Sequence, residues 1–508
     1  MAGGAGVTRK VVVVGAGFGG LAAACELAAR GAEVTLLERA AVPGGKAQRV
    51  AHGGFAWDTG PTLLTLPAVL DEVLGLAGMR LRDAVRAVPL SPLCRYRFAS
   101  GATLDHHADR DAMVAGIGAI DARDAAQWPA FEQHVRALWE TVGRAYVDEP
   151  FTGALDLAAR SARRGAGTVA MQLGLRTLGQ HAARWFRSPE MRQFVGRFAT
   201  YVGASPFRAP AALAMIAAVE GAGDAVYPVG GMARVAAVFA DAARRLGVTL
   251  RLDEPVRRIE RDGKGWRVST DARTADADAV LLDVDPLYAA TLFDDGSAAR
   301  DSLDADRGRT RSLSALVVHV ALRGRTEALA LHNVLFPANY AAEFDDVMER
   351  GALPSDGTVY VAAPSPVDAG TAPEGHEALF TLVNAPADLR ASDDASVARV
   401  QDHVLARLAA VDPSLPGRVV ALHAQRPMFI ASTGSADGAI YGVAPHGSLG
   451  TFRRPLARVA GARGLYLAGG CSHPGGGVPM TVRSGQHAAR TLAADLRLDV
   501  APALAVPA

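Results

Sequence analysis

Cysteine is scarce in this chain of 508 residues. The three cysteines form no CxxC pair and no metal-ligand spacing, and they are Cys25, Cys94 and Cys471. This usage argues against a disulfide scaffold and against zinc, and it suits a reducing compartment. We therefore expect a functional site without a metal ion.

Long apolar runs and an excess of one charge are also missing. No stretch of about 18 uninterrupted apolar residues occurs, and residues 1–9 lack the apolar core of a signal peptide. The formal net charge is +1, which gives no reason to expect nucleic acid as a partner. We expect a protein that is cytoplasmic or lies on a membrane surface.

The most informative segment lies near the N-terminus. An apolar run at 11–14 leads into Gly15-Ala16-Gly17-Phe18-Gly19-Gly20, an alanine-rich stretch follows to residue 30, and a second apolar run ends at Glu38. This order predicts a strand, a glycine turn, a helix, a second strand and an acid, which together form a unit that binds a dinucleotide. Because an acid at this position disfavours a 2′-phosphate, the unit fits FAD or NAD better than NADP.

Each residue type in this unit has a physical reason. Gly15 permits the tight turn, Gly17 lets the backbone approach a pyrophosphate, and Gly20 lets the helix lie close to the strand. Glu38 lies about 20 residues past the turn, where a carboxylate accepts hydrogen bonds from ribose hydroxyls. Lys46 is either a cation that reaches the same pyrophosphate or a solvated surface lysine.

The chain is too long for a single core, so we expect at least two domains. Residues 109–222 follow a mostly helical pattern. A largely antiparallel sheet with helices is predicted after residue 312 from three apolar runs, at 313–322, 359–363 and 378–383.

Two later segments repeat the combination of strand, glycines and helix. Residues 227–232 open a helix that runs to about residue 246, and a strand follows it. A strand at 465–470 leads through a glycine-rich loop to a helix ending at about residue 497, and the N-terminus of such a helix tolerates an anion. The nucleotide domain is therefore predicted from 9–85, 224–300 and 455–500, and the substrate domain from 86–223 and 301–454.

Five further segments are specific enough to compare with known families. They are Asp58-Thr59-Gly60-Pro61-Thr62 and residues 196–203, 438–442, 451–455 and 469–480. With them the chain resembles, over essentially its whole length, the FAD-dependent carotenoid desaturases of the phytoene desaturase family, which are related more distantly to amine oxidases. Within that family it is most similar to the bacterial 1-hydroxycarotenoid 3,4-desaturases, also called methoxyneurosporene dehydrogenases.

The resemblance implies FAD as the cofactor and an α/β fold. That fold has a Rossmann-like FAD-binding domain, with a parallel sheet and helices, and an α+β substrate domain with an antiparallel sheet and a helical, membrane-facing region. The amine oxidases have an acid after the Ala-Gly of the last strand, where this chain has Gly470-Cys471. The carotenoid desaturases also lack this acid, so its absence here favours them over the amine oxidases. It leaves open how the ribitol of FAD is bound.

The resemblance also implies where the cofactor is held. It places Gly15, Ala16, Gly17 and Gly20 at the pyrophosphate, Glu38 at the adenosine ribose, Lys46 near the pyrophosphate, and Val256 near the adenine through its backbone. It places Gly470, Val478, Pro479 and Met480 near the isoalloxazine, and Gly60 belongs to the same cofactor-binding set.

For this subgroup the resemblance implies C3–C4 dehydrogenation of an acyclic 1-hydroxy or 1-methoxy carotenoid. Hydride passes to FAD, a proton leaves the adjacent carbon, and the electrons go on to oxygen or a quinone. Three other functions stay open: desaturation of phytoene or diapophytoene, redox-neutral isomerisation of a carotenoid, and prenyl-protein escort as in the GDP-dissociation inhibitors. The intact glycine turn speaks against the escort, because those proteins lost the flavin.

Four side chains are candidates for the chemistry, and each has a structural alternative. His473 lies in the C-terminal glycine-rich loop and either accepts a proton or recognises a hydroxyl, or it caps a turn. Asp58 is either a general base or, as an Asp before Thr-Gly-Pro, a turn cap. Arg197 and Tyr201 either meet the oxygenated end of the substrate or pack on a helix face.

Because so apolar a substrate resides in the bilayer, we expect peripheral association with the inner face of the cell membrane. Residues 173–187 suit an interfacial helix, and the alternative is an amphipathic helix packed on the core. The residues concerned are Leu173, Leu175, Leu178, Trp185 and Phe186, interleaved with Arg176, Arg184 and Arg187. The arginine-rich residues 307–311 fit a solvated loop better than a binding patch.

Overall fold

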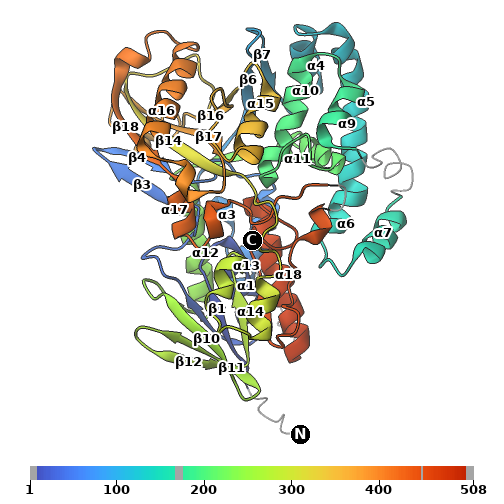
Figure 1. The fold of residues 1–508 in the computed structure, drawn as a ribbon, viewed down its shortest axis with the longest axis vertical. Coiled ribbons are helices and arrows are strands. Elements are labelled where there is room, and N and C mark those ends of the chain that lie inside the picture. Colours follow the sequence, from blue (N-terminus) through green and yellow to red (C-terminus); the bar gives the residue numbers. More distant parts are fainter. Residues whose placement is uncertain (1–7, 166–175, 448–449, 499–508) are drawn as a thin grey trace.

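Five parallel strands form a sheet in the lower half of the molecule in Figure 1. In the computed structural model, which describes residues 8–165, 176–447 and 450–498, these strands lie in the order β19, β13, β1, β2, β9. Their bounds are β1 Lys10–Val14, β2 Glu33–Leu37, β9 Thr249–Arg251, β13 Ala279–Leu282 and β19 Leu465–Leu467. Every neighbouring pair is parallel. The predicted strand, helix and strand unit is confirmed, with α1 (Phe18–Ala28) between β1 and β2.

The valines of β1 supply two separate cores, because successive side chains of a strand point to opposite faces. Val11 and Val13 pack in a cluster with the helices α1, α2 (Pro67–Leu76), α12 (Gly231–Arg245) and α18 (Val478–Leu496). Val12 and Val14 pack on the other face. That face is covered by an antiparallel sheet of β10 (Val256–Asp262), β11 (Gly265–Thr270) and β12 (Thr274–Ala277), with α13 (Pro286–Ala290) and α14 (Ala298–Leu303).

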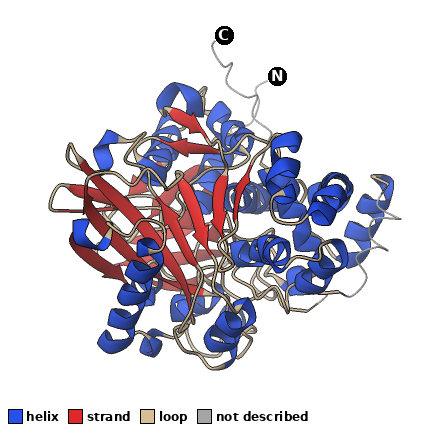
Figure 2. Cartoon of the chain, turned by 90° about the horizontal axis from the view of Figure 1, so that it is seen from above, coloured by secondary structure: helices blue, strands red, loops and turns tan. Residues whose placement is uncertain are grey.

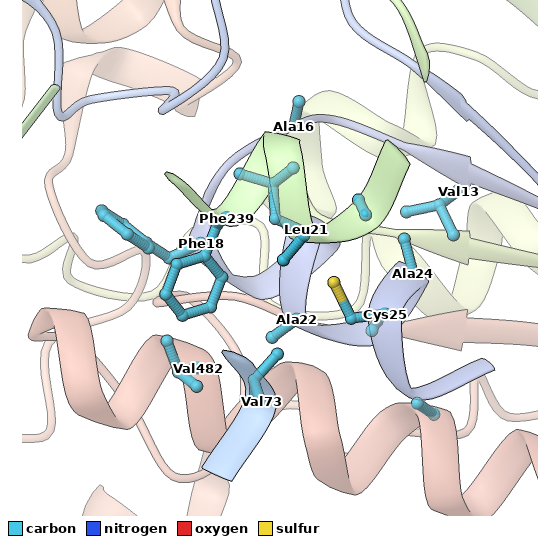
Figure 3. Packing of buried hydrophobic residues seen from close by; sticks show 14 of the residues in the cluster. Val13, Ala16, Phe18, Leu21, Ala22, Ala24, Cys25, Val73, Phe239 and Val482 are labelled. Carbon is cyan, nitrogen blue, oxygen red and sulfur yellow. The ribbon is translucent and has the colours of Figure 1, made fainter. Parts of the chain in front are cut away.

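The helix α1 is held tightly between its neighbours. Figure 3 shows Phe18 of α1 against Phe239 of α12, with Val482 of α18 nearby, and the two phenylalanine rings meet edge to face with centroids 5.5 Å apart. A Cβ on Gly485 of α18 would lie 2.2 Å from the Gly19 carbonyl oxygen. This close packing fixes where α1 begins, and therefore where its N-terminus points.

A seven-stranded sheet lies above, at the upper left in Figure 1. Its order is β18, β14, β17, β16, β15, β6, β7. The bounds are β6 Cys94–Arg97, β7 Thr103–His106, β14 Ser314–Arg323, β15 His332–Leu335, β16 Val359–Ala362, β17 His376–Ala385 and β18 Val419–Gln425. The sheet is mixed rather than wholly antiparallel, because β6 joins β15 in parallel. The helix α16 (Asp394–Ala409) covers one of its faces.

Residues 109–222 are mainly helical, as predicted, and lie at the upper right in Figure 1. The helices are α4 Arg110–Gly118, α5 Ala122–Leu138, α6 Arg144–Val147, α7 Ala154–Arg163, α9 Leu178–Trp185, α10 Pro189–Gly196 and α11 Ile216–Glu220. In the view from above, these helices lie on one side of the molecule and most of the strands lie on the other (Figure 2). Within the described ranges no helix is both long and apolar enough to cross a bilayer.

The segment predicted as an interfacial helix is only partly described, since Leu173 and Leu175 lie outside the described residues. Leu178 and Phe186 are buried in the core of the helical region, and Trp185 packs against it. The arginines at 184 and 187 are exposed. The described part therefore matches the alternative of an amphipathic helix packed on the core.

All strands of the parallel sheet come from residues 9–85, 224–300 and 455–500, and all strands of the mixed sheet from 86–223 and 301–454. The domain boundaries themselves stay a prediction. The other elements are β3 Arg49–His52, β4 Phe55–Asp58, α3 Leu81–Ala84, β5 Ala87–Pro89, β8 Val226–Pro228, α15 Tyr340–Phe344 and α17 Pro427–Ser432.

Candidate cofactor and substrate site

A cavity of about 520 Å³ joins the parallel sheet to the upper part of the molecule. One part of its lining is the N-terminal glycine turn, and another is the loop before α18. Further parts come from β14, β16 and β17 and from the helical residues 197–219. Residues predicted to hold a cofactor and residues of the predicted substrate domain therefore border the same space.

The glycine turn has the shape that its residues predict. Gly15 has a φ of +99°, and its N–H donates to the Leu37 carbonyl at 2.8 Å. A Cβ on Gly20 would lie 2.0 Å from the Gly15 carbonyl oxygen, so only glycine allows the helix to start this close to the strand. Gly15 and Gly17 line the cavity, whereas Gly20 supports the turn through its backbone.

Glu38 lies at the end of β2 and is fixed by two backbone N–H groups. Its Oε2 accepts from Ala16 at 2.7 Å and its Oε1 from Ala40 at 2.8 Å, and the residue is 7% exposed. Each carboxylate oxygen keeps a lone pair for another donor. The N–H of Glu254 donates to the Glu38 carbonyl at 2.8 Å, which brings Val256 to this edge of the cavity.

Lys46 lies inside the site. Its Nζ donates to the Ile440 carbonyl at 2.9 Å, and the side chain lines the cavity. A Cβ on Gly60, which also lines the cavity, would lie 2.6 Å from the Lys46 carbonyl oxygen. This geometry fits a cation in the site better than a solvated surface lysine, and the Asp58–Thr62 segment packs directly on the lysine loop.

Asp283, directly after β13, is a site residue that the sequence reasoning missed. Its Oδ2 accepts from the Gly20 N–H at 2.7 Å, and it lines the cavity. A Cβ on Gly17, Gly19 or Gly469 would lie within 2.7 Å of its carboxylate oxygens. Burial raises the pKa of Asp283 to about 6. The signal that could have found it is an acid at the carboxyl end of a parallel strand.

The loop before α18 supplies another part of the cavity wall. Gly470, Val478, Pro479 and Met480 all line the cavity, and α18 begins at Val478 with its N-terminus at this wall. The buried Arg454, also missed, lies behind the loop and donates from Nη1 to the carbonyls of Tyr441 and Gly470, each at 3.2 Å. A helix N-terminus and a buried cation make this wall electropositive.

Asp58 is not part of the cavity lining. Its Oδ1 accepts from the Met232 N–H at 3.2 Å, at the start of α12, and a Cβ on Gly231 would lie 2.1 Å from that oxygen. Burial raises the pKa of Asp58 to about 7. The geometry fits the capping alternative, here of a helix, better than contact with a substrate.

His473 is not part of the cavity lining either. Its ring packs on Tyr146 with centroids 4.4 Å apart and on Phe151 at 5.5 Å. Burial lowers the pKa of His473 to about 3, so the ring is neutral at physiological pH. These contacts favour the structural alternative for His473.

Arg197 and Tyr201 do line the cavity. They follow α10 in a short 3₁₀ helix, Arg197–Val202. The Arg197 Nη1 donates to the Tyr201 hydroxyl oxygen at 2.6 Å. Of the four candidates for the chemistry, the structure brings these two together at the cavity and places the other two outside it.

A known family covers almost the whole chain. The family profile described as flavin containing amine oxidoreductase matches residues 18–493. Hydroxyneurosporene desaturase from Cereibacter sphaeroides is 37% identical over 96% of this chain and 98% of its own length. The chain belongs to the carotenoid desaturases of this family. The 1-hydroxycarotenoid 3,4-desaturase of Flavobacterium sp. (strain P99-3) is 28% identical over 94% of this chain and 97% of its own.

Solved structures support the fold of this carotenoid desaturase. Putrescine oxidase superposes with a TM-score of 0.64 at 17% identity, covering 96% of this chain and 99% of its own. The family depends on FAD, and the site fits that cofactor. Gly15 and Gly17 line the cavity just before the N-terminus of α1, Glu38 has free lone pairs, and Lys46 supplies a cation.

Proposed function

We propose that this carotenoid desaturase dehydrogenates the C3–C4 bond of an acyclic carotenoid with a 1-hydroxy or 1-methoxy end. The observation that carries the proposal is the single cavity that borders both the dinucleotide-binding edge and a largely apolar wall containing Arg197 and Tyr201. The similarity to hydroxyneurosporene desaturase supports the choice of substrate.

Different residues of the chain act at the two ends of the cavity. The turn at Gly15 and Gly17, Glu38 and Lys46 bind the nucleotide part of the cofactor. Apolar side chains line the remainder and exclude water from the polyene, and they include Leu213, Ile216, Val219, Phe380 and Leu382. FAD, when bound, supplies the acceptor for a hydride from an allylic carbon. A polyene held in this wall is aligned without polar contacts along most of its length.

We further propose that the enzyme is cytoplasmic and associates peripherally with the inner face of the membrane, and that oxygen or a quinone takes the electrons. The helix α7 supports the membrane contact. Its Leu155 is 89% exposed, and Arg163 and Arg164 are exposed at its other end. A helix with an exposed apolar residue at one end and exposed basic residues at the other suits an anionic bilayer surface.

Expression in cells supplied with either 1-hydroxyneurosporene or phytoene tests the substrate. The expected product is the hydroxylated carotenoid with two hydrogens fewer and a new double bond at C3–C4. Turnover of phytoene alone would refute the proposed substrate, and a product of unchanged mass would indicate an isomerase. Protein that absorbs no visible light even after reconstitution with FAD would favour an escort function.

A further inference from the structure

A pair of opposite charges lies in the wall of the cavity, joined by one tyrosine. The Arg197 Nη1 donates to the Tyr201 hydroxyl oxygen at 2.6 Å, and that hydroxyl donates to the Glu220 carboxylate. The second Glu220 oxygen lies 3.4 Å from His106 Nδ1. Glu220 therefore compensates the charge of Arg197 inside the protein, which lets Arg197 face an apolar cavity.

Most N–H donors of Arg197 have no acceptor among the described residues. A guanidinium carries five N–H groups, and within the described residues the structure gives it one acceptor, Tyr201. The guanidinium lies over the rings of Tyr96, Tyr201 and Tyr360, at 5.6, 4.8 and 5.9 Å from their centroids. These rings hold the guanidinium in place. Its remaining N–H groups are available to an oxygen atom in the cavity.

Two further hydroxyl groups, those of Tyr360 and Thr62, lie next to Arg197. The Tyr360 hydroxyl lies 2.5 Å from Thr62 Oγ1 and 2.6 Å from His332 Nδ1. Both Tyr360 and Thr62 line the cavity. Thr62 is two residues from Gly60, which packs on the Lys46 carbonyl. The cluster therefore borders the cofactor wall of the cavity.

The direction of the Tyr201 proton follows from the ionisation of Glu220. Burial opposes the charge of Glu220, but His106, Arg197 and Tyr201 together hold its pKa below the usual value. The carboxylate is ionised at neutral pH and accepts the Tyr201 proton. Hence the cluster offers N–H donors from Arg197 and hydroxyl oxygens as acceptors.

We propose that Arg197, with Tyr201 and the Thr62–Tyr360 pair, binds the oxygen at the C1 end of the carotenoid and thereby selects the C3–C4 bond. This inference rests on the proposed function. Only two carbon–carbon bonds separate C1 from C3, so the group that holds the oxygen must lie beside the reacting carbons. A hydrocarbon end in the same place would remove water from Arg197 without replacing its hydrogen bonds.

Two variants and a matched control test this role. Arg197→Met combined with Glu220→Gln removes both charges together, because removing one alone leaves an uncompensated buried charge. Tyr201→Phe keeps both charges and covers the case in which the double variant fails to fold. Tyr466→Phe is the control, because its hydroxyl donates at 2.7 Å to Asp495, which also pairs with an arginine, outside the cavity.

The measurement compares 1-hydroxyneurosporene with the same polyene lacking the hydroxyl. Binding to the holoenzyme in micelles is followed by quenching of tryptophan fluorescence, and kcat/KM and the position of the new double bond are determined in parallel. The wild type and Tyr466→Phe are expected to bind the hydroxylated polyene about 10- to 100-fold more tightly. Tyr201→Phe and the double variant are expected to lose most of this preference while binding the unhydroxylated polyene at least as tightly as the wild type does.

Variants that hold FAD and keep the wild-type preference would overturn the inference, as would variants that lose affinity for both polyenes equally. A wild type that desaturates the hydroxylated carotenoid without any preference in binding would also overturn it and would leave the proposed function standing. A wild type that prefers the hydroxylated polyene but does not desaturate it would support the binding site and refute the proposed function.

Discussion

The substitution Glu38→Gln probes the nucleotide end of the site. Both carboxylate oxygens of Glu38 accept a backbone N–H, from Ala16 at 2.7 Å and from Ala40 at 2.8 Å. A glutamine side chain has one acceptor oxygen and one NH₂ group. In either orientation one of the two backbone N–H groups faces an NH₂ group and loses its partner, and the charge that a ribose hydroxyl would meet is gone.

These two losses have different consequences. The unpaired backbone N–H is present with and without cofactor, so it lowers the free energy of unfolding by about 1–3 kcal/mol. The weakened contact with the ribose acts only when FAD is bound. A hydrogen bond to a charged group contributes about 1.5–3 kcal/mol, so the Kd for FAD is expected to rise about 10- to 100-fold.

Titration of the apoprotein with FAD, followed by flavin fluorescence, measures this Kd directly. Glu33→Gln is the control, because Glu33 is exposed at the start of the same strand, and its Kd is expected to equal that of the wild type. If Glu38→Gln binds FAD as tightly as the wild type does, the carboxylate does not hold the ribose and the reasoning from its position is refuted.

Three further predictions concern the turn, a buried acid and the membrane contact. Gly20→Ala is expected to abolish FAD retention in purified protein, because its Cβ would lie 2.0 Å from a carbonyl oxygen of the turn, whereas Gly75→Ala, with open space around it, is expected to retain FAD. Asp58 has a pKa raised to about 7 in the folded protein, so its charge lowers stability increasingly as the pH rises from about 4 to 7. Between pH 5 and pH 8 the free energy of unfolding of Asp58→Asn, measured in urea, should therefore rise by about 2–3 kcal/mol relative to that of the wild type. An equal pH dependence of the two proteins would contradict this. Leu155→Asp is expected to weaken flotation with anionic liposomes several-fold while Val420→Asp, at another exposed apolar site, on β18, leaves it unchanged; equal flotation of both variants would argue against α7 as the contact.

Local sequence signals predicted the elements whose residues are adjacent in the chain. The unit from β1 to β2 was predictable because valines, glycines and a terminal acid each have a separate physical reason there. The runs that became β14, β16 and β17 were predictable because they are continuous and apolar. The strand β18 was not predicted, since its side chains are mostly half-buried and its apolar run covers only Val419 to Leu422.

Contacts between segments that are far apart in the chain could not be predicted from the sequence. The parallel pairing of β6 with β15 joins Tyr96 to Val334, and no local pattern encodes it. The directions of the side chains at the site could not be predicted from local patterns either. His473 lies in a loop that lines the cavity, yet its ring packs on Tyr146 rather than lining the cavity itself, and Tyr201, the partner of Arg197, is hydrogen-bonded to Glu220 of another helix.

The central claim is that this carotenoid desaturase oxidises C3–C4 of a 1-hydroxy carotenoid at its flavin. The most direct test mixes anaerobic holoenzyme with 1-hydroxyneurosporene in liposomes and follows the flavin absorbance together with the product. The flavin is expected to bleach in proportion to a product with two hydrogens fewer and a double bond at C3–C4. A flavin that stays oxidised with this substrate, or that bleaches only with phytoene, would contradict it.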